Sequence, residues 1–265
     1  MIELPRPILI GMVHLPALPG SPRHCLSMDT IIDRAVQDAL TLRKAGFTAV
    51  IVENFGDAPF AADRIEPVAV ASMAVVAREV VRAFAMPVGI NALRNDAAAG
   101  LGIAAAVGAA FIRVNVHVGV AATDQGIIQG QAADTLRLRQ RIGPDIGIFA
   151  DVHVKHASPL SQPDIALAAE ETAYRGHADA LIVSGPSTGR AVDAANLRRV
   201  RDAVPDRPVL VGSGATAETI ADLLQLADGV IVGSSLKAGG RVEEPVDAER
   251  ARAFIAAVRG GAAPR

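Results

Sequence analysis

Short apolar segments alternate with longer amphipathic segments along the whole chain, eight times over. The longer segments carry apolar residues at helical spacing, as in residues 28–44. The short segments are rich in Val and Ile, which is typical of buried strands. They cover residues 8–15, 49–55, 87–92, 111–117, 146–156, 180–185, 208–214 and 229–235.

Boundary signals support this division into helices and strands. Ser27 or Asp29 is placed to cap the helix predicted over 28–44, and Gly46 follows its end, where glycine commonly terminates a helix. Gly143-Pro144 and Pro205 are expected to stop two later helices, because proline cannot continue a helix.

Strand–helix alternation requires parallel strands joined by right-handed crossovers, and eight such units close into an α/β fold of the (β/α)₈ TIM-barrel type. An open doubly wound sheet is the alternative, but the loop after the first segment, HLPALPGSP, lacks the glycine-rich dinucleotide fingerprint. No linker or charge block divides the chain, so residues 1–265 are predicted to form a single domain with a frayed tail at 259–265.

Composition excludes several classes of protein. The net charge is −2 and aromatic residues make up 3%, so we expect no nucleic-acid partner. No apolar run reaches the roughly 18 residues of an integral membrane segment, and the N-terminus is predicted to be a strand and not a signal peptide. The single cysteine, Cys25, forms no intrachain disulfide, which favours a cytoplasmic protein. It has no evident activating partner, so we do not expect it to be a nucleophile.

Polar residues occupy the ends of all eight predicted strands. TIM barrels carry their active sites at these ends, whereas the simpler explanation, contact with solvent, accounts better for serines than for charged residues beside Val and Ile. The candidate catalytic residues are His14, Glu53, Asn91, Arg113, Asn115, Asp151, His153 and Lys155, accompanied by Asn54 and His117.

The fifth segment concentrates this chemistry. Asp151, His153 and Lys155 alternate with valines, so a regular strand would direct all three into the barrel mouth. Asp151 would orient His153 or bind a metal. Lys155 would neutralise an anion, act as a base or form a Schiff base. The alternative is an internal ion pair that only satisfies buried charge.

The other strand ends leave further alternatives open. Arg113 is placed to pair with Asp151 or Glu53, and its role would then be structural. His14 and Glu53 would form an acid/base pair. Alternatively, a divalent metal ion would be held by His14, Glu53, Asp151 and His153, although these ligands come from separate strands.

Two similar motifs follow the seventh and eighth segments, VGSGAT at 211–216 and VGSSLK at 232–237. Glycines let backbone N–H groups turn inward, and phosphate-binding barrels hold their phosphate at these strands. Glycine and serine are also common in ordinary turns. Lys237 would approach the same phosphate or be solvated. The predicted phosphate-binding residues are Ser184, Gly185, Gly212, Ser213, Gly214, Gly233, Ser234 and Ser235.

Three loops carry weaker signals. The loop over residues 14–24 is rich in Pro and Gly and long enough to act as a lid. Phe55 and Phe60 would cover a substrate or a partner subunit. Thr123 and Asp124 are placed to cap the following helix.

Several motifs resemble the BtpA/SgcQ family: GMVHLPALPGSP, ENFGDAPF, VNVHVG followed by TDQG, ADVHVKHA, LIVSGPSTG, VLVGSGAT and VIVGSSLKAGG. The resemblance runs in order over about residues 5–257. It implies a barrel related to ribulose-phosphate-binding barrels. One branch of the family is associated with photosystem I accumulation and another with sugar-uptake genes, and neither association defines a reaction.

These observations favour an enzyme acting on a small phosphorylated metabolite, such as a sugar phosphate, as an isomerase, epimerase or aldol-type lyase. Glu53, Asp151 or His153 would move a proton next to a carbonyl group, and Lys155 or a metal would stabilise the resulting charge. A nucleosidase or phosphohydrolase would use the same groups differently. The non-enzymatic alternative is an assembly or regulatory factor, and a homo-oligomer is possible in either case.

Overall fold

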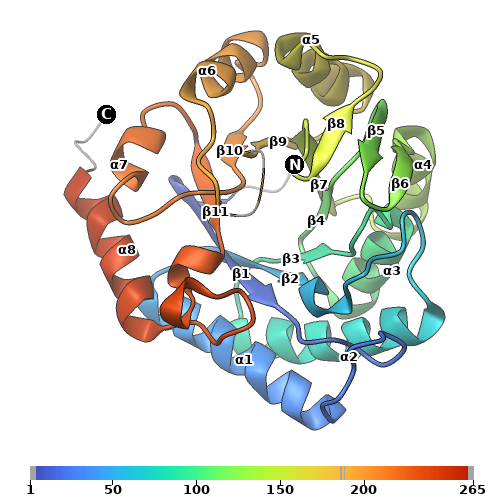
Figure 1. Cartoon of the computed structure of the whole chain (residues 1–265), viewed down its shortest axis with the longest axis vertical. Coiled ribbons are helices and arrows are strands. Elements are labelled where there is room, and N and C mark those ends of the chain that lie inside the picture. Colours follow the sequence, from blue (N-terminus) through green and yellow to red (C-terminus); the bar gives the residue numbers. More distant parts are fainter. Residues whose placement is uncertain (1–3, 186, 188, 262–265) are drawn as a thin grey trace.

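Eight parallel strands close into a barrel that helices surround (Figure 1). The computed structural model describes residues 4–185, 187 and 189–261. β1 pairs with β11 in parallel, which closes the sheet and excludes the open doubly wound alternative. The barrel strands, one within each predicted segment, are β1 (Ile8–His14), β2 (Ala49–Glu53), β3 (Val88–Asn91), β4 (Phe111–Val114), β7 (Gly147–Val152), β9 (Ala180–Val183), β10 (Val209–Val211) and β11 (Gly229–Val232).

The helices follow the predicted order. The main ones are α1 (Met28–Ala45), α2 (Pro67–Phe84), α3 (Ala97–Val107), α4 (Ala132–Ile142), α5 (Ile165–Glu170), which continues into the π-helix η2 (Glu171–Arg175), α6 (Ala194–Ala203), α7 (Ile220–Leu223) and α8 (Ala248–Gly261). Short 3₁₀ turns are η1 (Phe55–Asp57), η3 (Ser234–Leu236) and η4 (Ala238–Gly240).

The predicted boundaries of the first helix are confirmed. The Ser27 side chain accepts a hydrogen bond from the backbone N–H of Thr30, and Gly46 ends α1 with a φ of 113°. α4 and α6 stop immediately before Gly143 and Val204-Pro205, also as predicted. α8 continues through 259–261, so these three residues of the predicted frayed tail are helical, while 262–265 lie outside the described residues.

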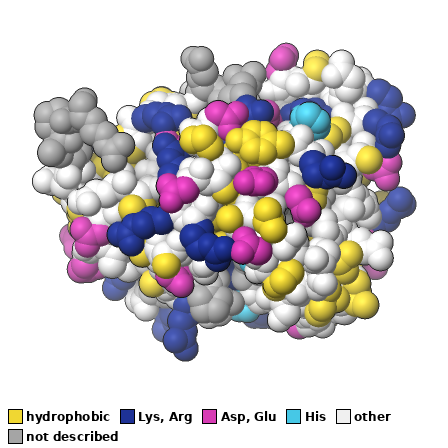
Figure 2. Space-filling view, turned by 90° about the horizontal axis from the view of Figure 1, so that it is seen from above, with side chains coloured by type: hydrophobic (Ala, Val, Ile, Leu, Met, Phe, Trp, Pro, Cys, Tyr) yellow, Lys and Arg dark blue, Asp and Glu magenta, His cyan; other side chains and the backbone are white. Residues whose placement is uncertain are grey.

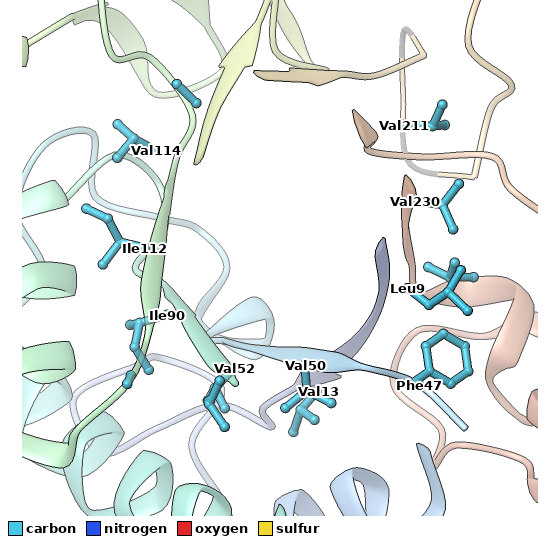
Figure 3. Close-up of a cluster of buried hydrophobic side chains, with 14 of the residues drawn as sticks. Leu9, Val13, Phe47, Val50, Val52, Ile90, Ile112, Val114, Val211 and Val230 are labelled. Atoms are coloured by element: carbon cyan, nitrogen blue, oxygen red, sulfur yellow. The ribbon is translucent and has the colours of Figure 1, made fainter. Parts of the chain in front are cut away.

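The core has two layers, one on each side of the barrel wall. Outward-facing strand residues such as Val13, Val50 and Ile90 point away from the barrel centre towards the helices (Figure 3). Inside the barrel, Phe111 and Phe149 stack with ring centroids 4.3 Å apart. A Cβ at Gly89 would lie 2.2 Å from the Phe111 ring, so glycine is needed there to admit this stack.

A small antiparallel sheet in the order β6-β5-β8 was not anticipated by the sequence pattern. It consists of β5 (Val120–Thr123), β6 (Gly126–Gln129) and β8 (Ala157–Pro159). The prediction that Thr123 and Asp124 cap a helix is wrong, because both lie at the β5–β6 turn and α4 begins only at Ala132. Thr123 Oγ1 closes this turn by donating to the Gly126 carbonyl at 2.9 Å.

The surface carries both signs of charge. Lys and Arg side chains are interspersed with Asp and Glu over the face seen in Figure 2, and hydrophobic side chains are scattered between them. Within 4–185, 187 and 189–261, no helix is long and apolar enough to cross a membrane.

Candidate functional site

Glu53 lies at the centre of a row of three buried polar side chains. The parallel register aligns His14 of β1 with Glu53 of β2, and Glu53 with Asn91 of β3. The Asn91 amide donates to Glu53 Oε2 at 2.5 Å, and His14 Nε2 lies 3.6 Å from Glu53 Oε1. The register therefore brings three of the predicted residues into one group.

The environment of His14 keeps its imidazole neutral. Burial lowers the pKa of His14 well below its ordinary value, and the positive charges of Lys237, Lys155 and Arg113 lower it further. Its Nδ1 atom is buried without a hydrogen-bond partner among the described residues, as is the Oδ1 atom of Asn91. Unpaired buried polar atoms are costly, so the hydrogen bonding of this row is incomplete at both atoms.

Arg113 and Asp151 form a buried bidentate ion pair. Arg113 Nε and Nη2 each donate to Asp151 at 2.8 Å. Asn115 and Ser184 add donors to the same carboxylate at 3.2 and 3.3 Å. Burial opposes the charge of Arg113, but Asp151 outweighs that effect and the pKa of Arg113 is raised. Of the two partners predicted for Arg113, the structure selects Asp151.

The prediction that Asp151, His153 and Lys155 share one strand face is wrong beyond Val152. β7 ends at that residue, and His153 has a φ of 52°, in the left-handed region, so the strand alternation is broken. His153 Nε2 makes a 2.7 Å hydrogen bond with the carbonyl oxygen of Gln162. His153 lines a third cavity beside the small sheet, and Asp151 and Asn115 line the same cavity.

The four predicted metal ligands are not brought together. Asp151 is held by Arg113, and His153 Nε2 is hydrogen-bonded to the Gln162 carbonyl oxygen. In the described part of the chain, no three His, Cys, Asp or Glu side chains are grouped so that they would hold a metal ion.

The two glycine-rich loops line one cavity, as predicted. Its wall contains Gly212, Ser213 and Gly214 from the loop after β10, and Gly233, Ser234 and Ser235 from the loop after β11. His14, Glu53, Arg113 and Lys155 also line it. We call this the glycine-loop cavity.

The hydroxyl groups of two of these serines stabilise the loops themselves. Ser213 Oγ accepts from the Gly185 N–H at 2.8 Å and donates to the Arg190 carbonyl at 3.2 Å. Ser235 Oγ donates to the Ala215 carbonyl at 2.8 Å. Two residues predicted to bind phosphate, Ser184 and Gly185, are not part of the wall of the glycine-loop cavity.

A second cavity of about 520 Å³ adjoins the first, and we call it the outer cavity. Glu53 and Lys155 line both cavities. Phe55 and Phe60, with ring centroids 6.5 Å apart, form part of its apolar wall. The rest of the wall is formed by Leu93, Arg94, Asn115, Asp124, Gln125 and His156.

The position of Lys155 affects its protonation. Burial and the charge of Arg113 lower the pKa of Lys155, while Glu53 and Asp151 oppose the shift.

Arg94 and Gln125 were missed in the sequence analysis. Arg94 lies three residues beyond the end of β3, where strand alternation no longer gives a direction. Gln125 lies with Asp124 in the β5–β6 turn. The sequence signal for this turn is Gly126, since glycine is common at hairpin turns, but it does not indicate where the Gln125 side chain points.

Lys237 is neither solvated nor part of the glycine-loop cavity, so both predictions for it are wrong. Its side chain is 1% exposed and forms an ion pair with Asp38 of α1. The other oxygen of Asp38 accepts from the Val246 N–H at 2.7 Å. An apolar stem of four carbons allows Lys237 to cross the interior to this partner.

The closed eight-stranded sheet and the charged groups at its carboxyl end define a TIM barrel with a buried polar mouth. The profile of the BtpA family matches residues 6–260, and the chain belongs to that family.

Curated relatives agree with this assignment. The chain is 46% identical to the photosystem I biogenesis protein BtpA of Synechocystis sp., over 96% of this chain and 88% of the relative. It is 49% identical to an uncharacterized protein of Thermococcus kodakarensis, over 96% of each. The putative sgc region protein SgcQ of Escherichia coli is 33% identical, over 93% of this chain and 92% of the relative.

Solved structures with the same fold include a native KDPGal structure, with a TM-score of 0.61 and 18% identity over 98% of this chain and 97% of the other. Phosphoribosyl anthranilate isomerase from Thermus thermophilus has a TM-score of 0.59 and 16% identity over 95% and 98%. At these identities the likeness establishes the fold.

Proposed function

We propose that this protein is an enzyme that acts on a small phosphorylated metabolite, such as a sugar phosphate, as an isomerase, epimerase or aldol-type lyase. The observation that carries the proposal is that Glu53 and Lys155 line both the glycine-loop cavity and the outer cavity. A substrate with its phosphate in the first cavity and its remaining atoms in the second would pass between these two groups.

Backbone geometry supports phosphate binding in the glycine-loop cavity. Gly214 has a φ of 75°, and a Cβ at Gly233 would lie 2.8 Å from the His14 ring, so glycine allows both loops to approach the barrel mouth closely. Lys155 lines the same cavity and contributes positive charge, whereas the charge of Arg113, which also lines it, is paired with Asp151. Because Ser213 and Ser235 use their hydroxyls within the loops, backbone N–H groups and Ser234 would be the main donors to a phosphate.

Glu53 is the best-placed proton acceptor. Asn91 fixes one of its oxygens, while the other faces His14. A carboxylate in this position would remove a proton next to a substrate carbonyl, and Lys155 with neutral His14 would stabilise the charge that develops on oxygen. Asp151 is bound through both oxygens by Arg113, so we assign it a positioning role, and we assign no step to His153.

A thermal-shift screen of the purified protein against inorganic phosphate, sugar phosphates and nucleotides tests binding first. A ligand at 100 times its dissociation constant stabilises the folded state by about 2.7 kcal/mol, which is readily detected. Turnover of any compound that binds is then measured for Glu53→Gln and Lys155→Met. We expect each variant to lose roughly 10²- to 10⁴-fold in kcat. Arg137→Gln on the exposed face of α4 is the matched control, and full turnover by both site variants would refute the assignment.

A non-catalytic assembly factor is the second candidate, favoured by the 46% identity to a photosystem I biogenesis protein. The chain and its Glu53→Gln variant would be expressed in Synechocystis lacking its own BtpA. Equal restoration of photosystem I by both chains would support the assembly role. Restoration by the unmodified chain alone would support chemistry at Glu53.

A further inference from the structure

Arg94 is a buried cation that has no anionic partner within residues 4–185, 187 and 189–261. Its residue is 5% exposed, and its Nη2 atom donates to the Lys155 carbonyl at 2.6 Å. Among the residues that the structure describes, no carboxylate forms an ion pair with Arg94, and that carbonyl is the one acceptor bound to a guanidinium that has five N–H donors. No Arg94 nitrogen is sealed inside the protein without a partner, so the remaining donors open into the outer cavity that Arg94 lines.

The neighbouring carboxylates already have other partners. Asp151 is bound by Arg113, Glu53 accepts from Asn91, and Asp124 accepts from the Gln125 side chain. Burial lowers the pKa of Arg94, while Asp151 and Glu53 only partly compensate. A buried cation is strongly unfavourable unless an anion pairs with it, so a protein that retains one in a cavity wall has a use for an anionic ligand there.

We propose that Arg94 binds a carboxylate of the substrate, so that the proposed enzyme acts on a phosphorylated carboxylic acid. This inference rests on the proposed function. Arg94 lines only the outer cavity, and the two glycine-rich loops line only the glycine-loop cavity. Glu53 and Lys155 line both cavities and so lie where the cavities meet. The substrate would therefore be held by an anionic group at each end, with the reacting carbons beside Glu53.

The chemistry of the outer cavity agrees with such a ligand. The planar guanidinium fork matches a carboxylate through two parallel hydrogen bonds. Phe55, Phe60 and Leu93 form an apolar wall that would limit water and so strengthen this ion pair. Asn115 and Gln125 add two amide side chains to the same wall, and such polar groups suit hydroxyl groups along the carbon chain. A hydroxylated acid phosphate fits all three features.

The alternative is that Arg94 only positions Lys155 through its backbone carbonyl. Matched pairs of ligands separate the two roles. In each pair the acid and the alcohol differ only in that a carboxylate replaces a hydroxymethyl group. We would measure the dissociation constants of 6-phosphogluconate against sorbitol 6-phosphate, and of D-3-phosphoglycerate against sn-glycerol 1-phosphate, by isothermal titration calorimetry. A positioning role would affect acid and alcohol alike.

We expect at least one acid to bind roughly tenfold or more tightly than its matched alcohol, since a charge-assisted bidentate pair is worth about that factor. Arg94→Gln should abolish the preference and leave the affinity for the alcohol nearly unchanged. Arg94→Lys keeps the charge but loses the fork, and should retain only part of the preference. Arg137→Gln should behave as the unmodified protein.

Three results would overturn the inference. Equal binding of acid and alcohol in both pairs would rule out recognition of a substrate carboxylate, while the proposed function would stand. A preference that survives in Arg94→Gln would show that Arg94 is not the recognition group. Absence of binding by inorganic phosphate and all four compounds would overturn the proposed function as well. If Arg94→Gln fails to fold by circular dichroism, Arg94→Lys and the matched pairs on the unmodified protein decide the question.

Discussion

His14 and His117 illustrate how burial sets chemistry at the scale of single residues. Burial lowers the pKa of both imidazoles; neighbouring cations add to the effect at His14, whereas the Gly176 carbonyl, 2.8 Å from His117 Nε2, partly opposes it. In the unfolded chain both groups return to their ordinary pKa near 6.5. Below that pH the unfolded state binds more protons than the folded state, so stability must fall as the pH is lowered.

We therefore predict that the melting temperature falls steeply from pH 7 to pH 5. Each buried histidine contributes at most about 1.4 kcal/mol per pH unit below its unfolded pKa. The His14→Gln/His117→Gln double variant should show a flatter dependence of melting temperature on pH, measured by circular dichroism. Replacing the exposed His24 by Gln is the control. Parallel curves for the double variant and the unmodified protein would contradict the assignment.

The residue scale also shows where strand periodicity stops predicting side chains. His14, Glu53 and Asn91 each end a regular strand, so the predicted row of strand-end groups agrees with the register. His153 follows the end of β7 in a left-handed conformation, and Arg94 follows the end of β3 by three residues. The directions of these two side chains do not follow from the two-residue period of a strand. They depend on the loop backbone, which tertiary contacts fix.

At the scale of elements, the loop after β11 is held by contacts far along the chain. Lys237, just after η3, pairs with Asp38 of α1 in the interior, and Asp38 also accepts from Val246. These bonds connect the loop that lines the glycine-loop cavity to the first helix. The motif VGSSLK thus combines a cavity-lining part with an anchoring lysine.

Lys237→Met is predicted to lower the free energy of unfolding by about 3–5 kcal/mol, because it leaves the Asp38 carboxylate buried without its cation. Adding Asp38→Asn removes that charge but keeps an acceptor for Val246. The Lys237→Met/Asp38→Asn double variant should therefore be more stable than Lys237→Met alone, as measured by urea unfolding. A double variant that is less stable than either single variant would argue against a buried ion pair.

Gly214→Ala is predicted to disturb the loop after β10. A Cβ there would lie 2.4 Å from the Arg190 carbonyl, and the φ of 75° is unfavourable for alanine. We expect a loss of roughly 1–3 kcal/mol in stability together with weaker binding of inorganic phosphate. Gly102→Ala, in α3 with no atom near its added Cβ, should instead stabilise by about 0.5–1 kcal/mol. Unchanged phosphate affinity in Gly214→Ala would place the phosphate elsewhere.

The element scale also explains which parts of the fold were predictable. All eight barrel strands and the boundaries of α1 followed from apolar runs and capping residues. The sheet of β5, β6 and β8 did not, because its strands, VAAT, GIIQ and ASP, lack the apolar runs of the barrel strands and contain alanine, glycine, proline and polar residues. Such short strands are fixed by their partners and not by propensity.

At the scale of the whole molecule, closure of the barrel connects the two ends of the chain. Ile8 of β1 is paired with Gly229 of β11, and one continuous outer core runs from Leu9 to Val258 of α8. Repeated alternation indicated eight units, but only the pairing of first with last strand shows that they close. A homo-oligomer and a cytoplasmic location remain predictions.

A continuous core predicts that the chain unfolds as one unit. Differential scanning calorimetry should give a single transition whose calorimetric and van't Hoff enthalpies agree, and circular dichroism should report the same midpoint. These methods suit a chain that has one tyrosine and no tryptophan. A fragment ending at residue 131 should remain unfolded, because β1 would lack β11 and β4 would lack β7. Two resolved transitions, or a folded fragment, would instead show that the barrel consists of separately stable halves.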